Sequence, residues 1–565
     1  MSSPALLAAA TAAALLAMAC PSESPVPAPA TPAPTPGGGA KAPEVATGPS
    51  RLRWGTQQEP NTLQPILSDM AATTHVCNLI HGYFVRIDNE MNLVPDLIEE
   101  LPTLQNGGIS ADYLTYTYHL RKDATFQDGS PVTSEDVSFT HALIMNPKVN
   151  AYSRDIYDKV KSIDTPDEHT VVFHLTEVFA PFNLIFNEFP ILPKHLLADK
   201  NNEQFNTDPY NRNPVGAGPY KVKNWVSGSH IELTAYENYF RGKPKIDEID
   251  VKFIPEEQVL MVQMQTQELD YYDNANTSQY DELKKIPGLA VYTTPANTYE
   301  HIDFQCRKPE LADKRIRQAV GYAIDRNQIS QKVYRGLWKP AYSNQSPLSW
   351  AYNKDNESVL VYDPERAKTL LDEAGWKDTD GDGIRDKGGK RLELVMSTTV
   401  GRPLRERTEQ VVQEQLKQVG IALSIKNYNA TLFFGTVEEK GILKTGDYDL
   451  GLFAWLAGVD PDDYTIWGGD QFPPVGQNST FWKNDRATEL LKQGRGVVDR
   501  DKRVPLYREI QKIIADDMPM VPLLYWVNID PVTDRLRNFK PNPTRQGNTW
   551  NAWEWELGPP APKPS

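Results

Sequence analysis

The stretch RERTEQVVQEQLKQVGIALSIKNY, residues 405–428, predicts a helix followed at once by a strand. A helix over 405–419 collects its apolar residues on one side and stops at Gly420; these residues are Val411, Val412, Leu416 and Val419. The strand ALSIKNY begins two residues later, at 422. A helix joined directly to a strand is typical of mixed α/β proteins, so the stretch predicts that class.

The same alternation of strands and helices continues outward in both directions, from Arg51 to about residue 557. YTYHL at 116–120 and TVVFHL at 170–175 predict strands, because they are rich in aromatic and β-branched residues. Thr133 with Asp136 predicts a helix start between them. Pro364 predicts another helix start, because proline suits the first helical position.

The length and charge of the chain exclude several classes of protein. Its 565 residues exceed what one hydrophobic core supports, so several lobes are expected. A net charge of −15 argues against binding nucleic acid, whose phosphates need a basic surface. After residue 20, no apolar run approaches the roughly 20 residues of a membrane-spanning helix.

The N-terminus predicts export and attachment to a membrane. Residues 1–19 are typical of a signal peptide, and the small residues before Cys20 resemble the lipobox of bacterial lipoproteins. Cys20 would then be the lipid attachment site, and the Pro/Ala-rich residues 20–49 an extended linker. The alternative is an ordinary cleaved signal with an incidental cysteine. Cys77 and Cys306 then remain, either as a disulfide or as two separate buried thiols.

The sequence predicts no catalytic centre, because it contains no HExxH, GxSxG, GxxxxGK[ST] or GxGxxG motif. We therefore expect neither an enzyme nor a required cofactor. DTDGDGIRD, residues 378–386, resembles the first half of an EF-hand loop and would offer calcium the ligands Asp378, Asp380, Asp382 and Asp386. Residue 389 is glycine where such a loop has glutamate, and the alternative is a solvated Asp/Gly hairpin.

Several longer segments together resemble the bacterial extracellular solute-binding proteins of family 5, the dipeptide and oligopeptide receptors of ABC importers. The most diagnostic is PVGAGPYKVKNWVSGSHIELTAYENYFRGKPKIDEIDVKFI, residues 214–254, with its Gly-x-Gly-Pro-Tyr strand. LRKDATFQDGSPVTSEDVSFT at 120–140, DKRIRQAVGYAIDRNQI at 313–329 and YREIQKIIADDMPMVPL at 507–523 follow the family's order. The resemblance covers residues 52–557.

The resemblance implies a periplasmic-binding-protein-like α/β fold of type II, cluster C, in which two lobes close on a ligand beside an extra domain. Lobe I would comprise 50–88, 211–303 and 525–557, lobe II 89–210, and lobe III 304–524, followed by a Pro-rich tail at 558–565.

The resemblance also implies ligand contacts. Arg402 would bind a ligand carboxylate, since the family's dipeptide receptors carry an arginine there; the alternative is a surface charge at a helix start. Asp460 would bind an α-amine, although Gly458 occupies the position at which relatives carry that aspartate. Trp455 and Trp467 would form apolar walls, and ordinary core packing is the alternative for both.

The implied function is the substrate-binding lipoprotein of an ABC importer. It would capture peptides outside the cytoplasmic membrane, in the periplasm or at the cell surface, and deliver them to the permease as a monomer. Its other partners would be the permease subunits and, through the lipid anchor, the membrane. Two alternatives stay open: a receptor of the same fold for a glycoside, nickel complex or opine, and a tethered hydrolase using the carboxylates of 460–463.

Overall fold

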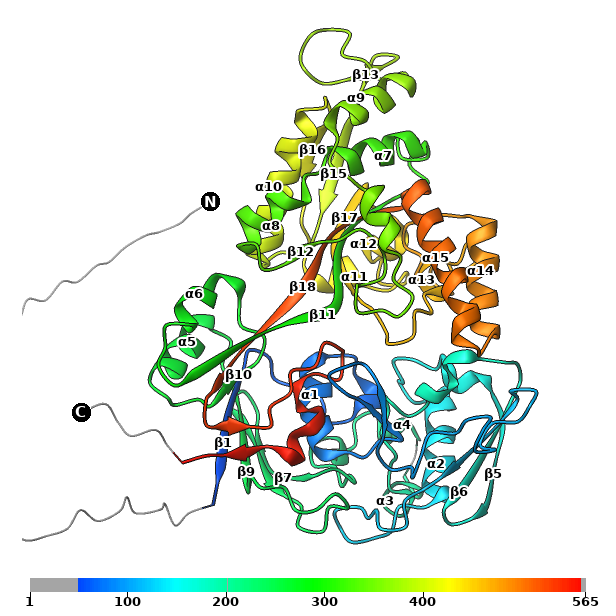
Figure 1. The fold of residues 1–565 in the computed structure, drawn as a ribbon, viewed down its shortest axis with the longest axis vertical. Helices are drawn as coiled ribbons and strands as arrows, with labels where there is room; N and C mark the ends of the chain where they lie inside the picture. Colours follow the sequence, from blue (N-terminus) through cyan, green and yellow to red (C-terminus); the bar gives the residue numbers. More distant parts are fainter. Residues whose placement is uncertain (1–48, 201, 560–565) are drawn as a thin grey trace, which may run out of the picture. The chain divides into compact units, whose positions relative to one another are not determined.

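The computed structural model describes residues 49–200 and 202–559 of the chain. Within them, helices and strands alternate along the sequence, and the predicted α/β class is confirmed (Figure 1). None of the helices in these residues has the length and apolarity needed to cross a membrane. The predicted signal peptide, Cys20, and nearly all of the predicted linker and tail lie outside the described residues.

The helix–strand unit predicted at 405–428 is present as α10, Pro403–Lys417, and β16, Ala422–Ile425. Gly420 stands between them at φ +86°, a left-handed conformation that favours glycine. Val412 and Leu416 are fully buried, so the predicted apolar side of the helix faces the core.

One large mixed sheet contains eleven of the strands. Its order is β16, β15, β17, β11, β18, β10, β1, β9, β8 and β7, with β12 pairing to β18. Apart from β16, these strands are β1 Arg51–Thr56, β7 Tyr220–Val226, β8 His230–Ala235, β9 Glu248–Phe253, β10 Tyr271–Tyr272, β11 Leu289–Phe304, β12 Lys339–Pro340, β15 Glu393–Ser397, β17 Leu450–Leu456 and β18 Met520–Thr533.

Smaller sheets surround the large one. The predicted strands at 116–120 and 170–175 are present as neighbours, β4 and β6, in a sheet of three. The strands of the smaller sheets are β2 Val85–Ile87, β3 Leu93–Pro95, β4 Thr115–His119, β5 Val160–Asp167, β6 Thr170–Leu175, β13 Asp386–Lys387, β14 Lys390–Arg391, β19 Leu536–Arg537 and β20 Glu556–Leu557.

Two helices begin where the sequence predicts a start, at Thr133 and at Pro364. The Thr133 N–H donates to the Asp136 carboxylate at 2.8 Å before α2.

Besides α10, the α-helices are α1 Ala71–Ile80, α2 Ser134–Met145, α3 Lys194–Leu197, α4 Asn202–Phe205, α5 Glu257–Gln265, α6 Tyr280–Leu283, α7 Lys314–Ala323, α8 Arg326–Tyr334, α9 Pro364–Glu373, α11 Ala430–Phe434, α12 Ile442–Thr445, α13 Tyr464–Trp467, α14 Asp485–Gly496 and α15 Arg500–Asp517. Short 3-10 helices are η1 Pro65–Leu67, η2 Ile156–Lys159, η3 Ala180–Leu184, η4 Pro209–Arg212, η5 Thr277–Gln279, η6 Lys354–Ser358 and η7 Asn548–Glu554.

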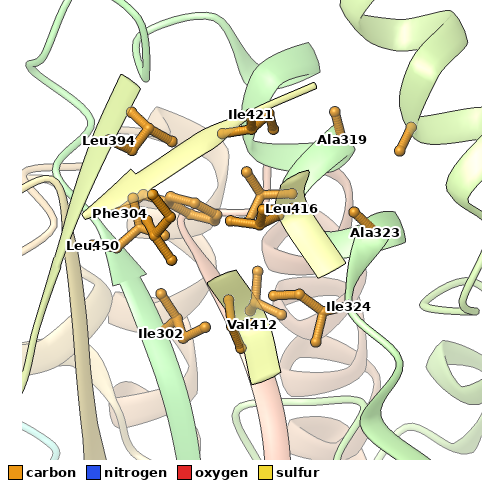
Figure 2. Close-up of a cluster of buried hydrophobic side chains, with 14 of the residues drawn as sticks. Ile302, Phe304, Ala319, Ala323, Ile324, Leu394, Val412, Leu416, Ile421 and Leu450 are labelled. Carbon is orange, nitrogen blue, oxygen red and sulfur yellow. The ribbon is translucent and has the colours of Figure 1, made fainter. Parts of the chain in front are cut away.

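Three large clusters of buried apolar side chains lie within the described residues. Core A draws on residues between Ile302 and Leu524, core B on residues between Ile66 and Ala217, and core C on both ends of the described chain, from Leu52 to Trp555. Figure 2 shows core A, where side chains of β11, β15 and β17 meet those of α7 and α10. The predicted lobe boundaries stay a prediction.

The two cysteines of the described chain are free. Cys77 is buried in core C, whereas Cys306 packs against core A. The structure therefore has two separate thiols, one of the two alternatives that the sequence leaves open.

The strands β11 and β18 form the longest ladder of the sheet. It starts at the pair Leu289–Thr533, near core C, and ends at Asp303–Met520, beside Ile302 and Val521 of core A. A register shift interrupts it between Pro295 and Tyr299. A β-bulge of this kind bends a strand, so the ladder changes direction between the two cores.

The Gly-x-Gly of the diagnostic segment lies against the end of α1. A Cβ at Gly216 would lie 2.1 Å from the carbonyl oxygen of Ile80, and one at Gly218 would lie 2.5 Å from the Ile80 carbonyl carbon. The Gln127 side chain seals the contact, donating to Ile80 and Gly218 oxygens at 2.9 and 3.2 Å. Only glycine permits this approach of two backbones.

We expect Gly216→Ala to lower the free energy of unfolding by about 1–3 kcal/mol, because the added methyl group must displace backbone rather than a side-chain tip. The measurement is urea denaturation followed by tryptophan fluorescence. Gly496→Ala is the control, since a Cβ there meets open space at the end of α14. A Gly216→Ala midpoint equal to that of the control would contradict the role of the close contact.

Candidate ligand-binding cavity

A cavity of about 720 Å³ lies between segments that are distant in the sequence. Its lining comes from residues within 65–87, 152–189, 454–477 and 544–546, together with Tyr299 of β11. Sites for small molecules and cofactors in proteins commonly measure about 300–1,000 Å³. The size therefore fits an organic ligand with several functional groups.

The segment 457–458 is fixed to the β11 strand by one buried amide. Asn297 lies in the register shift of β11 and is fully buried. Its Nδ2 donates to the carbonyl oxygens of Ala457 and Gly458, both at 2.9 Å, and its Oδ1 accepts from the Ser346 hydroxyl at 2.6 Å. The bend in the ladder thus determines the position of the cavity wall formed by residues 457–458.

Aromatic side chains form much of the lining on both sides. Trp455 of β17 stands opposite Tyr299 in the ladder and is half-buried. On the other wall, Tyr157 stacks on Phe189 at 5.3 Å, and the Tyr152 ring meets Phe189 edge-on at 5.0 Å. Such rings offer rigid apolar faces at a small cost in conformational entropy.

Asp460, predicted to bind an amine, lines the cavity but already has a cationic partner. Arg503 of α15 donates to both carboxylate oxygens, at 2.7 and 2.6 Å, in a bidentate pair. The Arg503 side chain is only 4% exposed and also donates to the Gly494 carbonyl. A ligand amine at Asp460 would therefore have to compete with a buried guanidinium.

Arg495, near the end of α14, joins one wall of the cavity to the other. Its Nε lies 2.6 Å from the Asp462 carboxylate, and its Nη2 lies 3.1 Å from Asp155, just before η2. The guanidinium also stacks on Phe179 and on Tyr464. Burial raises the pKa of Asp462 in spite of the nearby arginine.

Asp463 is the most deeply buried carboxylate of the lining, with 7% of the residue exposed. Its Oδ2 accepts hydrogen bonds from the Asn344 and Gln345 side-chain amides at 2.9 and 2.7 Å. Among the described residues, no group donates to Oδ1. Burial raises the pKa of Asp463 to about 7, and Asp462 and Asp460 add to the shift.

The opposite wall contains the single basic residue of the lining, Arg545. Its Nη2 donates to the Asp69 carbonyl oxygen at 2.8 Å, and the guanidinium lies over the Tyr152 ring. The Tyr152 hydroxyl donates in turn to the Glu188 carboxylate. Burial acts to lower the pKa of Arg545, but Glu188, Tyr152 and Asp69 outweigh it and the pKa is raised.

The structure brings two of the four predicted ligand contacts to the cavity. Asp460 and Trp455 line it. Trp467 is not among the lining residues; it is 1% exposed and packs edge-on against Trp482. Arg402 is exposed at the start of α10, also outside the lining. The roles given to these four residues stay predictions.

Sequence reasoning missed Asp463, Arg495 and Arg545. Asp463 stands in the same acidic run as Asp460, but nothing in the pattern distinguishes the paired carboxylate from the one with a free oxygen. Arg495 and Arg545 belong to no motif, and only the folded chain places them beside carboxylates 33 and 357 positions away in sequence, respectively.

The predicted calcium loop lies far along the chain from the cavity, between α9 and β13. Oxygen atoms of Asp378, Asp380 and Asp382 lie within 4.8 Å of one another, and all three residues are exposed. Asp386 instead accepts from the Thr379 backbone N–H at 3.0 Å. Asp378 accepts from Gly381 and Gly383 backbone N–H groups, as in a hairpin turn. Calcium binding stays a prediction.

The comparisons with known proteins concern most of the chain. Residues 92–471, more than half of it, match the model of bacterial extracellular solute-binding proteins, family 5. The chain is 31% identical over 506 residues to the oligopeptide-binding protein AppA of Bacillus subtilis, covering 89% of this chain and 91% of AppA.

Solved structures of similar proteins share the fold of this chain. AppA of Bacillus subtilis, in complex with a nonapeptide, superposes with a TM-score of 0.76 at 30% identity, covering 91% of this chain and 100% of that one. The ABC transporter substrate-binding protein CtaP of Listeria monocytogenes gives 0.79 at 25% identity, with 90% and 99% covered. The predicted periplasmic-binding-protein-like fold is confirmed.

We expect the buried Asp463 carboxyl to make stability depend on pH. Its pKa is about 7 in the folded chain, whereas an unfolded aspartate has a pKa of about 4. Between these values the folded chain holds a proton that the unfolded chain has released, so the free energy of unfolding falls as the pH rises from about 4 to about 7.

Asp463→Asn removes this titration while its side-chain oxygen still accepts from both amides. At pH 8 the variant should therefore unfold with a free energy higher than that of the wild type by on the order of 2–4 kcal/mol, and at pH 4 with nearly the same free energy. Urea denaturation at both pH values measures this, with the exposed Asp199→Asn as control. An equal difference at pH 4 and pH 8 would show that Asp463 does not titrate in this range.

Proposed function

The chain belongs to the bacterial extracellular solute-binding proteins of family 5, and on that premise we propose that it is the peptide-binding receptor of an ABC importer. It captures peptides outside the cytoplasmic membrane and delivers them to the permease subunits. AppA, which the chain matches over nearly its whole length, is named as an oligopeptide-binding protein and was solved with a nonapeptide.

The observation that carries this proposal is the composition of the cavity walls. A peptide presents an ammonium group, a carboxylate and apolar or aromatic side chains on one chain. The cavity offers a buried carboxylate at Asp463, a guanidinium at Arg545 and rings such as Trp455 and Tyr157. These groups complement all three features of a peptide, and the volume of about 720 Å³ gives room for several residues.

We assign recognition of the ligand amine to Asp463. Asp460 faces the same cavity, but its two oxygens are taken by Arg503, and separating a buried pair leaves an uncompensated charge. Asp463 has a free Oδ1, and two neutral amides hold its other oxygen. An ammonium ion beside Oδ1 stabilises the charged form of this carboxyl, whose pKa burial raises to about 7. For the ligand carboxylate we propose Arg545 within the lining, and Arg402, which lies outside the lining, for a ligand that extends beyond the cavity.

Binding rather than catalysis is what this arrangement supports. Family 5 consists of solute-binding proteins. A hydrolase that used the carboxylates of 460–463 would need one free acid and one free base. Here Asp460 and Asp462 are each paired with an arginine, which leaves Asp463 as the single carboxylate of 460–463 without a cationic partner, so the acid–base pair is incomplete. A receptor instead needs a ligand that stabilises one conformation over another, and the walls joined through Arg495 suit such closure.

The proposed function also implies a cellular location for the protein. We propose an extracytoplasmic protein, monomeric, attached to a membrane through lipidated Cys20 and the linker that follows it. Family membership supports the extracellular side. The lipid anchor and the monomeric state are carried by the sequence pattern and the resemblance alone.

Mass spectrometry of protein purified without refolding tests the function. We expect intact peptides of several residues to co-purify, because the cavity has room for them and closure of the lobes around a ligand slows its release. Peptides added to the emptied protein should be recovered unchanged. Recovery of cleaved fragments would favour the hydrolase, and a bound glycoside, nickel complex or opine would favour a receptor for another solute.

The assignment of Asp463 has its own test, calorimetric titration with a pentapeptide and its N-acetylated form. Asp463→Asn should weaken binding of the free-amine peptide at least about tenfold, because a buried charge pair across an interface is lost. Binding of the acetylated peptide should change by less than about twofold. Asp199→Asn serves as the control for folding and charge. Equal weakening for both peptides would remove Asp463 from this role.

A further inference from the structure

The lining of the cavity is strongly acidic. Among the described residues it contains one basic side chain, that of Arg545, and neither lysine nor histidine. The acidic residues number six: Asp69, Asp155, Glu188, Asp460, Asp462 and Asp463. Low-dielectric walls that carry one sign of charge concentrate ligands of the opposite sign.

Two arginines outside the lining neutralise only part of this charge. Arg503 is used by Asp460 in a bidentate pair. Arg495 lies between Asp155 and Asp462, so that one guanidinium serves two carboxylates. Three of the acidic residues therefore share two positive charges.

The remaining three acidic residues have Arg545 as the one cation of the lining; Asp69 and Glu188 are exposed, whereas Asp463 is buried. Glu188 accepts from the Tyr152 hydroxyl and lies near Arg545. The Asp69 carboxylate receives no hydrogen bond from any group in the described part of the chain, since Arg545 donates to the Asp69 carbonyl instead. Asp463 is the most buried of the six, more than nine-tenths, and its Oδ1 accepts no hydrogen bond from the described residues. Arg545 alone does not balance these groups.

We propose that the receptor selects cationic peptides, which carry at least one lysine or arginine side chain besides their terminal amine. This inference rests on the proposed function and narrows it. A peptide without charged side chains brings one ammonium and one carboxylate, so it leaves the acidic excess of the cavity unchanged. One basic side chain in the ligand compensates the excess left by Asp69 and Glu188.

The aromatic walls suit the same ligand. Tyr152, Tyr157 and Trp455 line the cavity, and a guanidinium or ammonium group binds aromatic rings favourably. Arg545 over Tyr152 and Arg495 over Phe179 show that cations of the chain itself already use rings of this lining. The alkyl stem of lysine or arginine can pack on the same rings while its charged end meets a carboxylate.

The test uses a pentapeptide series, Ala-Ala-X-Ala-Ala, in which X is lysine, norleucine or glutamate, and repeats it with X at each other position. Norleucine keeps the apolar stem of lysine and lacks its charge. At the preferred position, calorimetry should show lysine binding about tenfold tighter than norleucine, and glutamate weaker than norleucine. The advantage of lysine should shrink as the salt concentration rises, because salt screens charges at the cavity mouth.

Two variants identify the carboxylates responsible. Asp69→Asn combined with Glu188→Gln should reduce the ratio of lysine to norleucine affinity from about tenfold to about threefold or less. The matched control combines Asp199→Asn with Glu414→Gln, two exposed acidic residues outside the lining, and should keep the tenfold preference. Circular dichroism verifies that both double variants fold.

The possible results of these experiments distinguish the charge preference from the proposed function. Equal affinity for lysine, norleucine and glutamate in the wild type overturns the cationic preference and leaves the peptide receptor in place. Failure of every peptide to bind, with a non-peptide solute bound instead, overturns the proposed function and this inference together. Should the lining variants fail to fold, the comparison of the three peptides on the wild type still decides the charge preference.

Discussion

The antiparallel ladder between β11 and β18 is the constraint on which the other parts of the molecule depend. Each strand is continuous from core C to core A, so one ladder of backbone hydrogen bonds, interrupted by register shifts, connects the two cores. A change in the relative orientation of the cores has to bend this ladder, and the longer register shift, between Pro295 and Tyr299, has the fewest bonds to disturb. Asn297 occupies that point and holds the cavity wall at 457–458.

The chemistry of the cavity follows from how its charges are held. Asp460 and Asp462 have guanidinium partners from α15 and α14, which fixes their oxygens and removes them from competition for a ligand. Asp463 differs because amides, which carry no charge, satisfy only one of its oxygens. A buried carboxylate in that state gains most from a cation that arrives with the ligand, and this is the property a receptor requires.

The spacing of residues along the sequence was enough to predict individual helices and strands, but it was not enough to predict the residues of the cavity. The helix at 403–417, the strands near 116–120 and 170–175 and the start at Pro364 follow from residue spacing, because neighbours in sequence determine them. The site does not follow in this way. The resemblance predicted that Asp460 binds an amine, and no motif revealed that its partner would be Arg503, 43 positions away. Asp460 and Asp463 differ in their burial and in their pairing with residues distant in the sequence. Neither property can be predicted from the neighbouring residues.

The scattered origin of the cavity has a consequence for how the molecule is made. Its lining begins at Pro65 and is completed only by Thr544, Arg545 and Gln546, close to the end of the described chain. A polypeptide that emerges in order from a ribosome or a translocation channel therefore has no complete cavity until residue 546 has appeared. A chain truncated before residue 544 would lack one wall of the cavity.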